Sequence, residues 1–419
     1  MSQQKFYGWK LVGVLFLLYL AASITLYGGN IANTFMAKAT GMSRTIFGAG
    51  FAAAYLLVGL SSALAAVLVG KKGERFTLSL GMGAITLGSL IMAMAGQRPF
   101  WYILSFGLII GTGFAFATVL PIQSIITRWF VKKRALATAL VLTAGGVGGI
   151  LAAPLINKLI ETTNGKWQLA YYSMAAISAF VTVISALFVR NNPLDLGQRP
   201  DGDANAGIPG TNADKKQSRV YQTNEPWTLK EAVRTSPLWL LLAAASGQFI
   251  AFYLCIGHGV MHLTDNGIDD GLAALSLGIL AFASIGGRLL SGVLGDRIEP
   301  RFVIMAGLSL TMVGCLLILN PASPTMIYLY AIFIGTGFGL VYVCLFAMLG
   351  NYYGAANIQN FLGFLIPIVT LFGAGAPFVG GIIKDQMGSY NPAFIGTAVI
   401  AAVAALAQWL AVPPQKRST

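Results

Sequence analysis

About twelve apolar stretches run through this chain, and each is long enough to cross a lipid bilayer. A helix of about 20 apolar residues spans the hydrocarbon core, which is about 30 Å thick. Only 10% of the 419 residues are charged, whereas a soluble domain carries about a quarter. Since so few charges cannot cover a water-facing surface, we predict an all-α protein whose outer surface faces lipid. The predicted spans are 9–28, 46–69, 76–95, 100–126, 135–156, 167–189, 238–263, 271–295, 302–319, 325–349, 357–383 and 393–412.

The basic residues of the chain are unevenly distributed between the loops. The formal net charge is +13, a value that could indicate a nucleic-acid partner. With the N-terminus inside, however, 20 of the 27 lysines and arginines fall in cytoplasmic segments and six fall in outer ones. This asymmetry follows the positive-inside rule and predicts that both termini are cytoplasmic. Topology accounts for the basic excess, so we predict no nucleic-acid partner.

One long polar segment, residues 190–222, divides the chain into halves with six predicted spans each. It is rich in Gly, Pro, Asp and Asn and has little apolar surface to bury, so we expect a flexible linker. Thr228 and Glu231 follow it with the spacing of a capping box, which predicts a short helix lying on the membrane surface. The predicted divisions are residues 1–189, a linker over 190–236, and 237–419.

The two halves contain related segments at similar offsets. "LVGKKGERFTLSLG" from Leu68 and "LGDRIEPRFVIMAG" from Leu294 each follow the second span of a half. "AGGVGG" from Ala144 and "GAGAPFVGG" from Gly373 each lie in the fifth span. Such parallel repeats predict two pseudo-symmetric six-helix bundles with a cavity where they meet.

Four motifs carry a resemblance to a known family: "GRLLSGVLGDRIEPR", "FYGWKLVGV", "RWFVKKRALATALVLTAGGVGG" and "GSYNPAF". With them the chain resembles the major facilitator superfamily, and within it the monocarboxylate porters and oxalate:formate antiporter-type carriers. The resemblance implies a rocker-switch carrier of small organic anions, often proton-coupled, in the cell inner membrane. Three positions depart from the family pattern. Gly70 replaces an Asp in the first-half loop motif, Ser284 stands where monocarboxylate carriers often have an Asp, and the eleventh span lacks the Lys of oxalate carriers.

Arg288 is the one basic residue well inside an apolar span, eight residues before Asp296 at the predicted helix end. Placing an arginine there costs about 2.5–3.5 kcal/mol. None of the 14 acidic residues lies well inside another span. We therefore predict that Arg288 faces the central cavity and binds a carboxylate through its planar fork. A single fixed cation suits a monoanion. The alternative is that Arg288 caps carbonyl groups or extends to the inner surface.

Both histidines lie in "LCIGHGVMHL" in the seventh span. His258 is flanked by glycines, where a helix break would turn its ring inward, and the resemblance implies that a histidine of this span binds substrate. His262 lies nearer the outside and is the weaker candidate. The alternative for both is a structural histidine with satisfied hydrogen bonds. Imidazole titrates near neutral pH, so His258 is predicted to carry the coupled proton, with Arg288 as the second residue involved in the coupling. The alternative is that the substrate itself carries the proton.

Polar residues in the spans complete the predicted site, although packing is an alternative role for each. Asp296 with Arg297 and Arg301 is predicted to act as a cytoplasmic gate or as a topological anchor rather than to touch substrate. The remaining candidate substrate contacts are Tyr27, Asn30, Thr118, Ser284, Tyr342, Asn360 and Thr370.

No catalytic or metal site is evident in the sequence. The three cysteines lie in predicted spans without metal-ligand spacing, and no nucleophile–base pair or phosphate loop occurs. We therefore predict no enzyme activity and no cofactor. The predicted function is secondary active transport of a small monocarboxylate, such as lactate or pyruvate, with proton symport by alternating access, in a monomer. The alternatives are anion exchange, transport of a larger aromatic or amphipathic carboxylate, or, less favoured, drug export.

Overall fold

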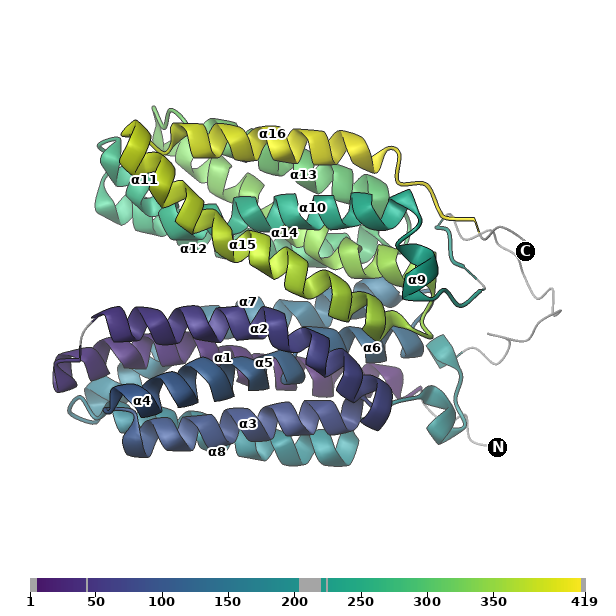
Figure 1. Cartoon of the computed structure of the whole chain (residues 1–419), viewed down its shortest axis with the longest axis horizontal. Coiled ribbons are helices and arrows are strands. Elements are labelled where there is room, and N and C mark those ends of the chain that lie inside the picture. Colours follow the sequence, from purple (N-terminus) through teal and green to yellow (C-terminus); the bar gives the residue numbers. More distant parts are fainter. Residues whose placement is uncertain (1–5, 43, 203–219, 224, 416–419) are drawn as a thin grey trace. The chain divides into compact units, whose positions relative to one another are not determined.

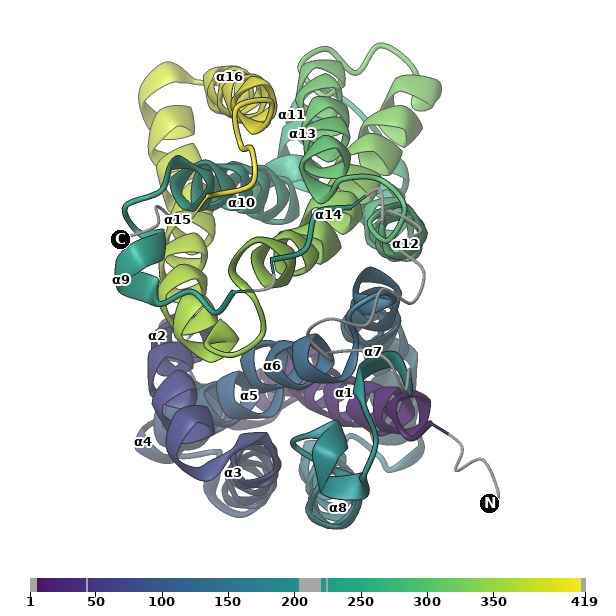
Figure 2. The ribbon, with the colours of Figure 1, turned by 90° about the vertical axis from the view of Figure 1, so that its right-hand side faces the viewer.

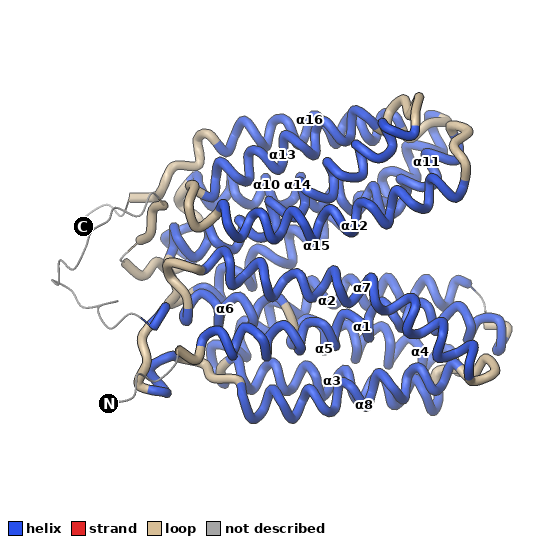
Figure 3. Tube along the Cα trace, turned by 180° about the vertical axis from the view of Figure 1, so that it is seen from behind, coloured by secondary structure: helices blue, strands red, loops and turns tan. Residues whose placement is uncertain are grey.

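All regular structure in the part of the chain described by the computed structural model, residues 6–42, 44–202, 220–223 and 225–415, is helical (Figure 3). Twelve helices or helical runs are long and apolar enough to cross a membrane. Six of them precede Val189 and six begin at or after Ser236. The prediction of an all-helical membrane protein with twelve spans is confirmed.

The helices are labelled in Figure 1, and several spans are built from more than one of them. The fourth span runs through α4, η1, α5 and α6, and the seventh through α10, η4 and α11. The α-helices are α1 (Gly8–Thr40), α2 (Arg44–Lys72), α3 (Glu74–Ala95), α4 (Pro99–Tyr102), α5 (Gly111–Ala117), α6 (Val119–Trp129), α7 (Arg134–Thr162), α8 (Trp167–Phe188), α9 (Leu229–Ala232), α10 (Ser236–Leu254), α11 (Val260–Asp265), α12 (Asp270–Leu294), α13 (Pro300–Leu317), α14 (Pro324–Tyr353), α15 (Ile358–Met387) and α16 (Asn391–Gln408). The π-helical segments are η1 (Ile103–Ile110) and η4 (Cys255–Gly259), and the 3-10 turns are η2 (Pro193–Leu196) and η3 (Pro200–Gly202).

Local sequence signals explain where many helices begin and end. Proline occupies the first turn of α4, α10, α13, α14 and α16, where its missing N–H has no helical partner to lose. Asp269 accepts a hydrogen bond from the Leu272 N–H at the start of α12. Gly388, at φ 71°, ends α15 in the left-handed conformation that glycine adopts without strain.

The described chain forms two compact units, and each is considered by itself. The first comprises Met1–Val131, Val141–Pro209 and Leu362–Pro367. The second comprises Lys132–Leu140, Gly210–Phe361 and Ile368–Thr419. The start of α7 therefore packs with the second unit, and a short stretch of α15 packs with the first.

In the first unit, α3 packs against α8 and α5, while α2 packs against α5 and η1. Gly81 of α3 permits close approach, because a Cβ there would lie 2.5 Å from the backbone nitrogen of Ala117. A buried hydrogen-bond network links three helices of this unit: Asn33 donates to the Tyr102 hydroxyl at 3.0 Å and accepts from the Tyr171 hydroxyl at 2.7 Å. Such a network satisfies polar groups that lipid could not.

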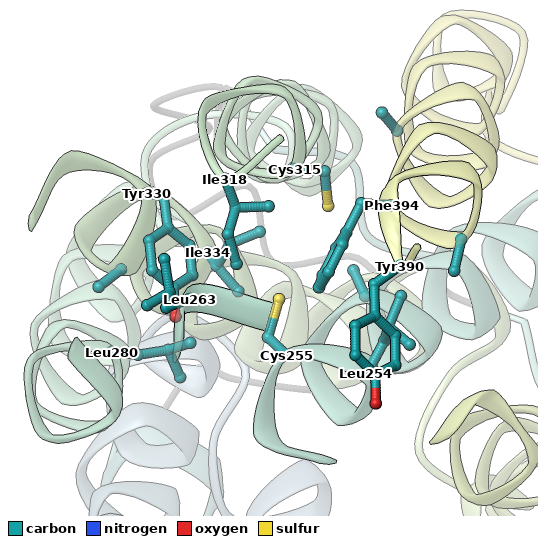
Figure 4. Packing of buried hydrophobic residues seen from close by; sticks show 14 of the residues in the cluster. Leu254, Cys255, Leu263, Leu280, Cys315, Ile318, Tyr330, Ile334, Tyr390 and Phe394 are labelled. Atoms are coloured by element: carbon teal, nitrogen blue, oxygen red, sulfur yellow. The ribbon is translucent and has the colours of Figure 1, made fainter. Parts of the chain in front are cut away.

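In the second unit, α14 packs against α12 and α13, while α16 packs against α13 and α10 (Figure 2). Apolar side chains fill the space between these helices (Figure 4). Cys255 and Cys315 are buried in that cluster as free thiols, in agreement with the predicted role as small fillers. Close helix packing with small residues at the contact is the usual solution inside a membrane, where lipid is as apolar as the side chains.

Three local expectations were wrong. Helix α1 does not end with the predicted span 9–28 but continues to Thr40, and no proline interrupts it. The fourth span is not one regular helix, since Thr118 lies at φ −126° and ψ −122° between α5 and α6. The start of the linker is ordered, as the next paragraph describes.

Residues 190–202 are held against the first unit by hydrogen bonds. Asn191 accepts from the Arg75 N–H at 2.8 Å, and Asp201 accepts from the Val131 N–H at 2.9 Å. Two 3-10 turns, η2 and η3, form there. The rest of the predicted flexible linker, residues 203–219, lies outside the described residues. The capping box at Thr228 and Glu231 is present and begins the short helix α9.

Candidate functional site

Arg288 is buried in the second unit, with 7% of its surface exposed. It lies six residues before Leu294, the last residue of α12, which places it about 9 Å along the helix from that end. Its guanidinium carbon is 5.2 Å from the ring centroid of Tyr342 and 5.6 Å from that of Phe338. Both distances are within the range of cation–π attraction, so the two rings help to hold the charge at this depth.

The two rings belong to a larger set of aromatic side chains, which we call the aromatic cluster. Phe338 stacks on Tyr342 at 5.2 Å and on Phe252 at 3.7 Å between ring centroids. Phe249 lies 5.5 Å from Phe338 and 5.8 Å from Tyr342. The cluster thus joins α10 to α14 beside the guanidinium of α12. Its members are Phe249, Phe252, Tyr253, Phe338, Tyr342 and Phe346.

Glycines explain why α12 and α14 approach so closely at this point. A Cβ on Gly339 would overlap the Ser284 carbonyl oxygen and lie 2.5 Å from the backbone nitrogen of Arg288. A Cβ on Gly287 would in the same way overlap the Thr336 carbonyl oxygen. Because both contacts are with backbone atoms, no side-chain movement can relieve them. The absence of side chains at these positions therefore sets the distance between Arg288 and the rings of α14.

Three further candidate contacts lie in the second unit. Ser284 is buried one turn before Arg288, and its hydroxyl donates to the Ala281 carbonyl at 2.7 Å. Thr370 is half-buried on α15, and Gly373 of the same helix packs against Phe249 of the aromatic cluster. Asn360 is exposed near the start of α15. Of the predicted polar contacts, Tyr342 lies against the Arg288 guanidinium.

His258 occupies η4, so the seventh span is widened into a π-helix at this point rather than broken. Its Nε2 lies 2.7 Å from the Pro377 carbonyl oxygen, and its ring stacks on Tyr390 at 4.8 Å. Because a carbonyl only accepts, Nε2 carries the proton of this hydrogen bond. Nδ1 is buried and has no hydrogen-bond partner among the described residues. The ring thus joins η4 to α15 and retains one nitrogen for a second proton.

His262 is buried, and its Nε2 lies 2.8 Å from the Ile318 carbonyl oxygen. Its ring also packs against Phe394 at 5.1 Å. Nearby, Lys384 forms an ion pair with Asp265 at 2.5 Å and lies 5.2 Å from the Tyr390 ring centroid. These contacts tie η4 and α11 to α13, α15 and α16. They agree with the structural role that we considered as the alternative for His262.

The candidates of the first unit have local partners. The Thr118 hydroxyl is buried and donates to the Phe114 carbonyl at 2.6 Å, so it satisfies the backbone where the fourth span is interrupted. Tyr27 is 40% exposed, and its ring packs beside Gly149 of α7. The side chain of Asn30 lies outside the described residues.

The predicted gate residues lie at the end of α12 and the start of α13. The Asp296 carboxylate accepts hydrogen bonds from the N–H groups of Ala135 at 2.8 Å and Leu136 at 3.0 Å. It therefore caps the first turn of α7, where an anion is favoured. Arg301 donates to the Trp409 carbonyl at 3.3 Å and stacks on Phe302. Arg297 is exposed.

The sequence analysis missed the partners that surround the predicted site. In the sequence, Phe338 and Phe249 look like ordinary apolar residues. In the structure, Phe338 lies against the Arg288 guanidinium and Phe249 packs against Phe338. The sequence does not reveal the role of Asn33, because its hydrogen-bond partners Tyr102 and Tyr171 lie 69 and 138 positions away. Glu74 was placed only at a helix end, yet it is buried and forms an ion pair with Arg128 at 3.0 Å. A single sequence gives no signal for such long-range pairs.

Comparisons with known proteins show the family of the chain. The sequence matches the family described as Major Facilitator Superfamily over residues 13–365 and 260–419. It is 28% identical over 337 residues to Monocarboxylate transporter 13 of Bos taurus, covering 80% of this chain and 72% of that protein. It is 25% identical over 437 residues to Monocarboxylate transporter 2 of Meriones unguiculatus, and the match covers 96% of this chain and 83% of that protein.

Solved structures share the fold at low sequence identity. The transporter FucP, in its outward conformation, matches with a TM-score of 0.73 and 16% identity, covering 96% of this chain and 98% of that one. The proton:xylose symporter XylE matches with a TM-score of 0.70 and 13% identity, covering 96% of each chain.

Proposed function

We propose, from the premise that this chain belongs to the Major Facilitator Superfamily, that it is a secondary active transporter of a small organic monoanion. Transport of a small molecule across a membrane follows from the family and the twelve spans. The substrate is the proposed part. Similarity to monocarboxylate transporters supports a monocarboxylate. The observation that carries the proposal is the buried guanidinium of Arg288 against the rings of Tyr342 and Phe338.

The chemistry of that arrangement favours a carboxylate ligand. A guanidinium that packs against rings uses its faces, while its N–H groups point outward in its plane. A carboxylate approaches in that plane and accepts two parallel hydrogen bonds. One fixed cation balances one negative charge, so lactate and pyruvate fit better than a dianion. The adjoining rings supply apolar surface for the short hydrocarbon part of such a substrate.

Alternating access then follows from charge compensation at Arg288. Moving a charge into a less hydrated environment is costly, and a bound anion lowers that cost. The loaded carrier therefore changes its access more readily than the empty one. This coupling of occupancy to movement is what a carrier requires.

A proton accompanies the anion in this proposal. His258 supports it, because Nδ1 is the ring nitrogen left to accept a proton while Nε2 bonds to Pro377. The substrate itself is the alternative carrier of the proton. Either route makes transport electroneutral, since one proton offsets one monoanion.

The proposed orientation places both termini in the cytoplasm and the protein, as a monomer, in the inner membrane. The distribution of lysine and arginine supports this topology. In that orientation Asp296, Arg297 and Arg301 lie on the cytoplasmic side. We propose that the Asp296 cap on α7 acts as the gate, because two charge-assisted hydrogen bonds join α12 to α7 there.

A larger aromatic carboxylate is the second candidate substrate. The aromatic cluster supports it, because Phe338 and Tyr342 lie against the guanidinium and Phe249 packs against both of these rings. Stacking of a substrate ring on such residues adds about 0.5–1.5 kcal/mol beyond burial. Benzoate is therefore a necessary probe beside lactate.

Uptake into proteoliposomes tests the proposal. Labelled lactate, pyruvate, acetate, oxalate and benzoate are offered with and without an inward proton gradient. We expect one monocarboxylate to accumulate faster with the gradient. Arg288→Gln removes the charge and is expected to abolish this uptake, while Arg288→Lys keeps the charge but loses the fork and is expected to retain only part of it. Arg98→Gln, at an exposed cation, serves as the matched control.

The outcomes separate the alternatives. Uptake that appears only after the vesicles are preloaded with anion identifies exchange instead of symport. Preference for benzoate over lactate identifies the larger substrate class. Normal affinity in folded Arg288→Gln protein rules out Arg288 as the anion-binding group.

A further inference from the structure

A cavity of about 640 Å³ lies at the start of α10 in the second unit, apart from Arg288 and the aromatic cluster. We call it the α10 cavity. Its walls come from three parts of this unit. Tyr221 belongs to the segment before α9, Arg234 and Ser236 lie just before and at the start of α10, and Val412 and Gln415 follow α16.

Hydrogen bonds hold two of the three wall segments in place. The Tyr221 N–H donates to Glu299 at 2.9 Å. The Thr235 hydroxyl, on another wall, lies 2.8 Å from the Tyr353 hydroxyl and donates to the Ala232 carbonyl. The cavity therefore has a defined shape when a ligand arrives, which reduces the entropy lost on binding.

One basic side chain lines the cavity, and the Glu299 carboxylate lies next to its wall, hydrogen-bonded to the Tyr221 N–H. Arg234 is the cation on its wall, and no Asp or Glu is among the described residues that line it. The Arg234 side chain is exposed, and the hydroxyl-bearing Ser236 beside it is exposed as well. A guanidinium with a neighbouring hydroxyl matches the oxygens of a phosphate group.

The cavity also lies at the boundary between lipid and water. The candidate spans Ser236–Asp265 and Asn391–Gln408 begin and end beside it. Trp239, one turn into α10, is 49% exposed and donates from Nε1 to the Val233 carbonyl at 2.8 Å. Trp409 and Leu410, after α16, are 63% and 67% exposed. Tryptophan at the end of a span is typical of the headgroup region.

We propose that the α10 cavity binds the phosphate headgroup of an anionic phospholipid, while the acyl chains lie along the exposed apolar side chains of α10 and α16. The charge of Arg234 selects an anionic headgroup, and the position at the boundary selects a lipid over a dissolved anion. Basic pockets at the ends of spans are a known means of headgroup binding. The site is separate from the proposed substrate site, because the residues that line the cavity are different from Arg288, Tyr342 and Phe338.

Thermal unfolding of the purified full chain tests this site. The protein is delipidated and titrated with dioleoyl phosphatidylglycerol, with dioleoyl phosphatidylcholine or with inorganic phosphate. We expect phosphatidylglycerol to raise the midpoint of unfolding more than phosphatidylcholine, and phosphate alone to have little effect. Arg234→Gln is expected to weaken the apparent affinity for phosphatidylglycerol by about fivefold, since one basic residue contributes about 1 kcal/mol.

Matched variants make the result decisive. Lys230→Gln removes an exposed cation four residues away, outside the lining, and is expected to behave like the unaltered protein. Ser236→Glu adds a negative charge to the wall, and the first turn of a helix tolerates it. Ser236→Glu is expected to abolish the preference for phosphatidylglycerol over phosphatidylcholine, whereas Ser236→Gln is expected to retain that preference. This second pair also replaces the first if Arg234→Gln protein does not fold.

Two results would overturn the proposal. Equal loss in Arg234→Gln and Lys230→Gln would mean that the lipid responds to general surface charge. Equal protection by inorganic phosphate and phosphatidylglycerol would mean that the cavity takes a dissolved anion and that the acyl chains make no contribution.

Discussion

Two adjacent glycines in α12 offer a direct test of how the candidate site is held together. A Cβ on Gly287 would overlap the Thr336 carbonyl oxygen and lie 2.9 Å from the Thr336 Cα, both in α14. A Cβ on Gly286 would meet nothing within 4 Å. The two positions have the same helical backbone but opposite surroundings. Alanine at each therefore separates the effect of helix packing from the effect of helix propensity.

The magnitudes follow from these contacts. Replacing glycine by alanine in a helix stabilises it by about 1 kcal/mol, and this gain applies to both variants. Overpacking a closely packed contact costs about 1–3 kcal/mol, and this cost applies only to Gly287→Ala. We therefore expect the free energy of unfolding of Gly287→Ala to be lower than that of Gly286→Ala by about 1–3 kcal/mol.

Reversible unfolding in mixed detergent micelles, followed by tryptophan fluorescence, measures that difference. Substrate uptake provides the second measurement. Because Gly287 precedes Arg288, moving α12 away from α14 also moves the guanidinium from the rings, so Gly287→Ala should weaken substrate affinity while Gly286→Ala should not. Equal stability and equal uptake in the two variants would show that the α12–α14 contact does not position Arg288.

Two further predictions concern charged groups away from the rings. Asp296→Ala removes the cap on the first turn of α7 and should lower the free energy of unfolding by about 1 kcal/mol, as measured by the same unfolding assay. Asp296→Asn, which keeps an acceptor, should lose less. Glu74→Gln removes the ion pair with Arg128 and should lower the free energy of unfolding by about 1 kcal/mol, well below the cost for a fully buried pair, because Arg128 is partly exposed and Gln also removes the cost of burying a carboxylate. An unchanged unfolding midpoint in either protein would contradict its prediction.

The number of spans and the fold class could be predicted from the sequence because both depend on local signals. An apolar run of about 20 residues needs no partner to be recognised. The capping box of Thr228 and Glu231, which predicted the start of α9, is a local signal of the same kind. The length of α1 was harder to predict, because the apolar run that marks the span ends before the helix does.

Within the candidate site, Arg288 and Tyr342 were predictable from the sequence, but the phenylalanines around them were not. Arg288 stands out because a charge in an apolar run is rare. The phenylalanines do not stand out, since Phe338 and Phe249 are two of 25 in the chain. His258 was expected to face inward at a helix break, yet its bond to Pro377 depends on the π-helix η4 and on a residue 119 positions away. Pairings at that separation are set by tertiary packing, which sequence periodicity does not encode.

The rings beside Arg288 bear on how a charge can be both stable and functional within a membrane span. Inserting the arginine costs about 2.5–3.5 kcal/mol, and a cation–π contact contributes about 0.5–2 kcal/mol. Tyr342 and Phe338 together therefore offset a substantial part of that cost. A carboxylate of the protein would offset it as well, but it would also compete with an incoming anion for the guanidinium N–H groups. Rings stabilise the charge through its faces and do not compete in its plane. An arginine stabilised in this way can bind an anion and release it again, which a carrier must do in every cycle.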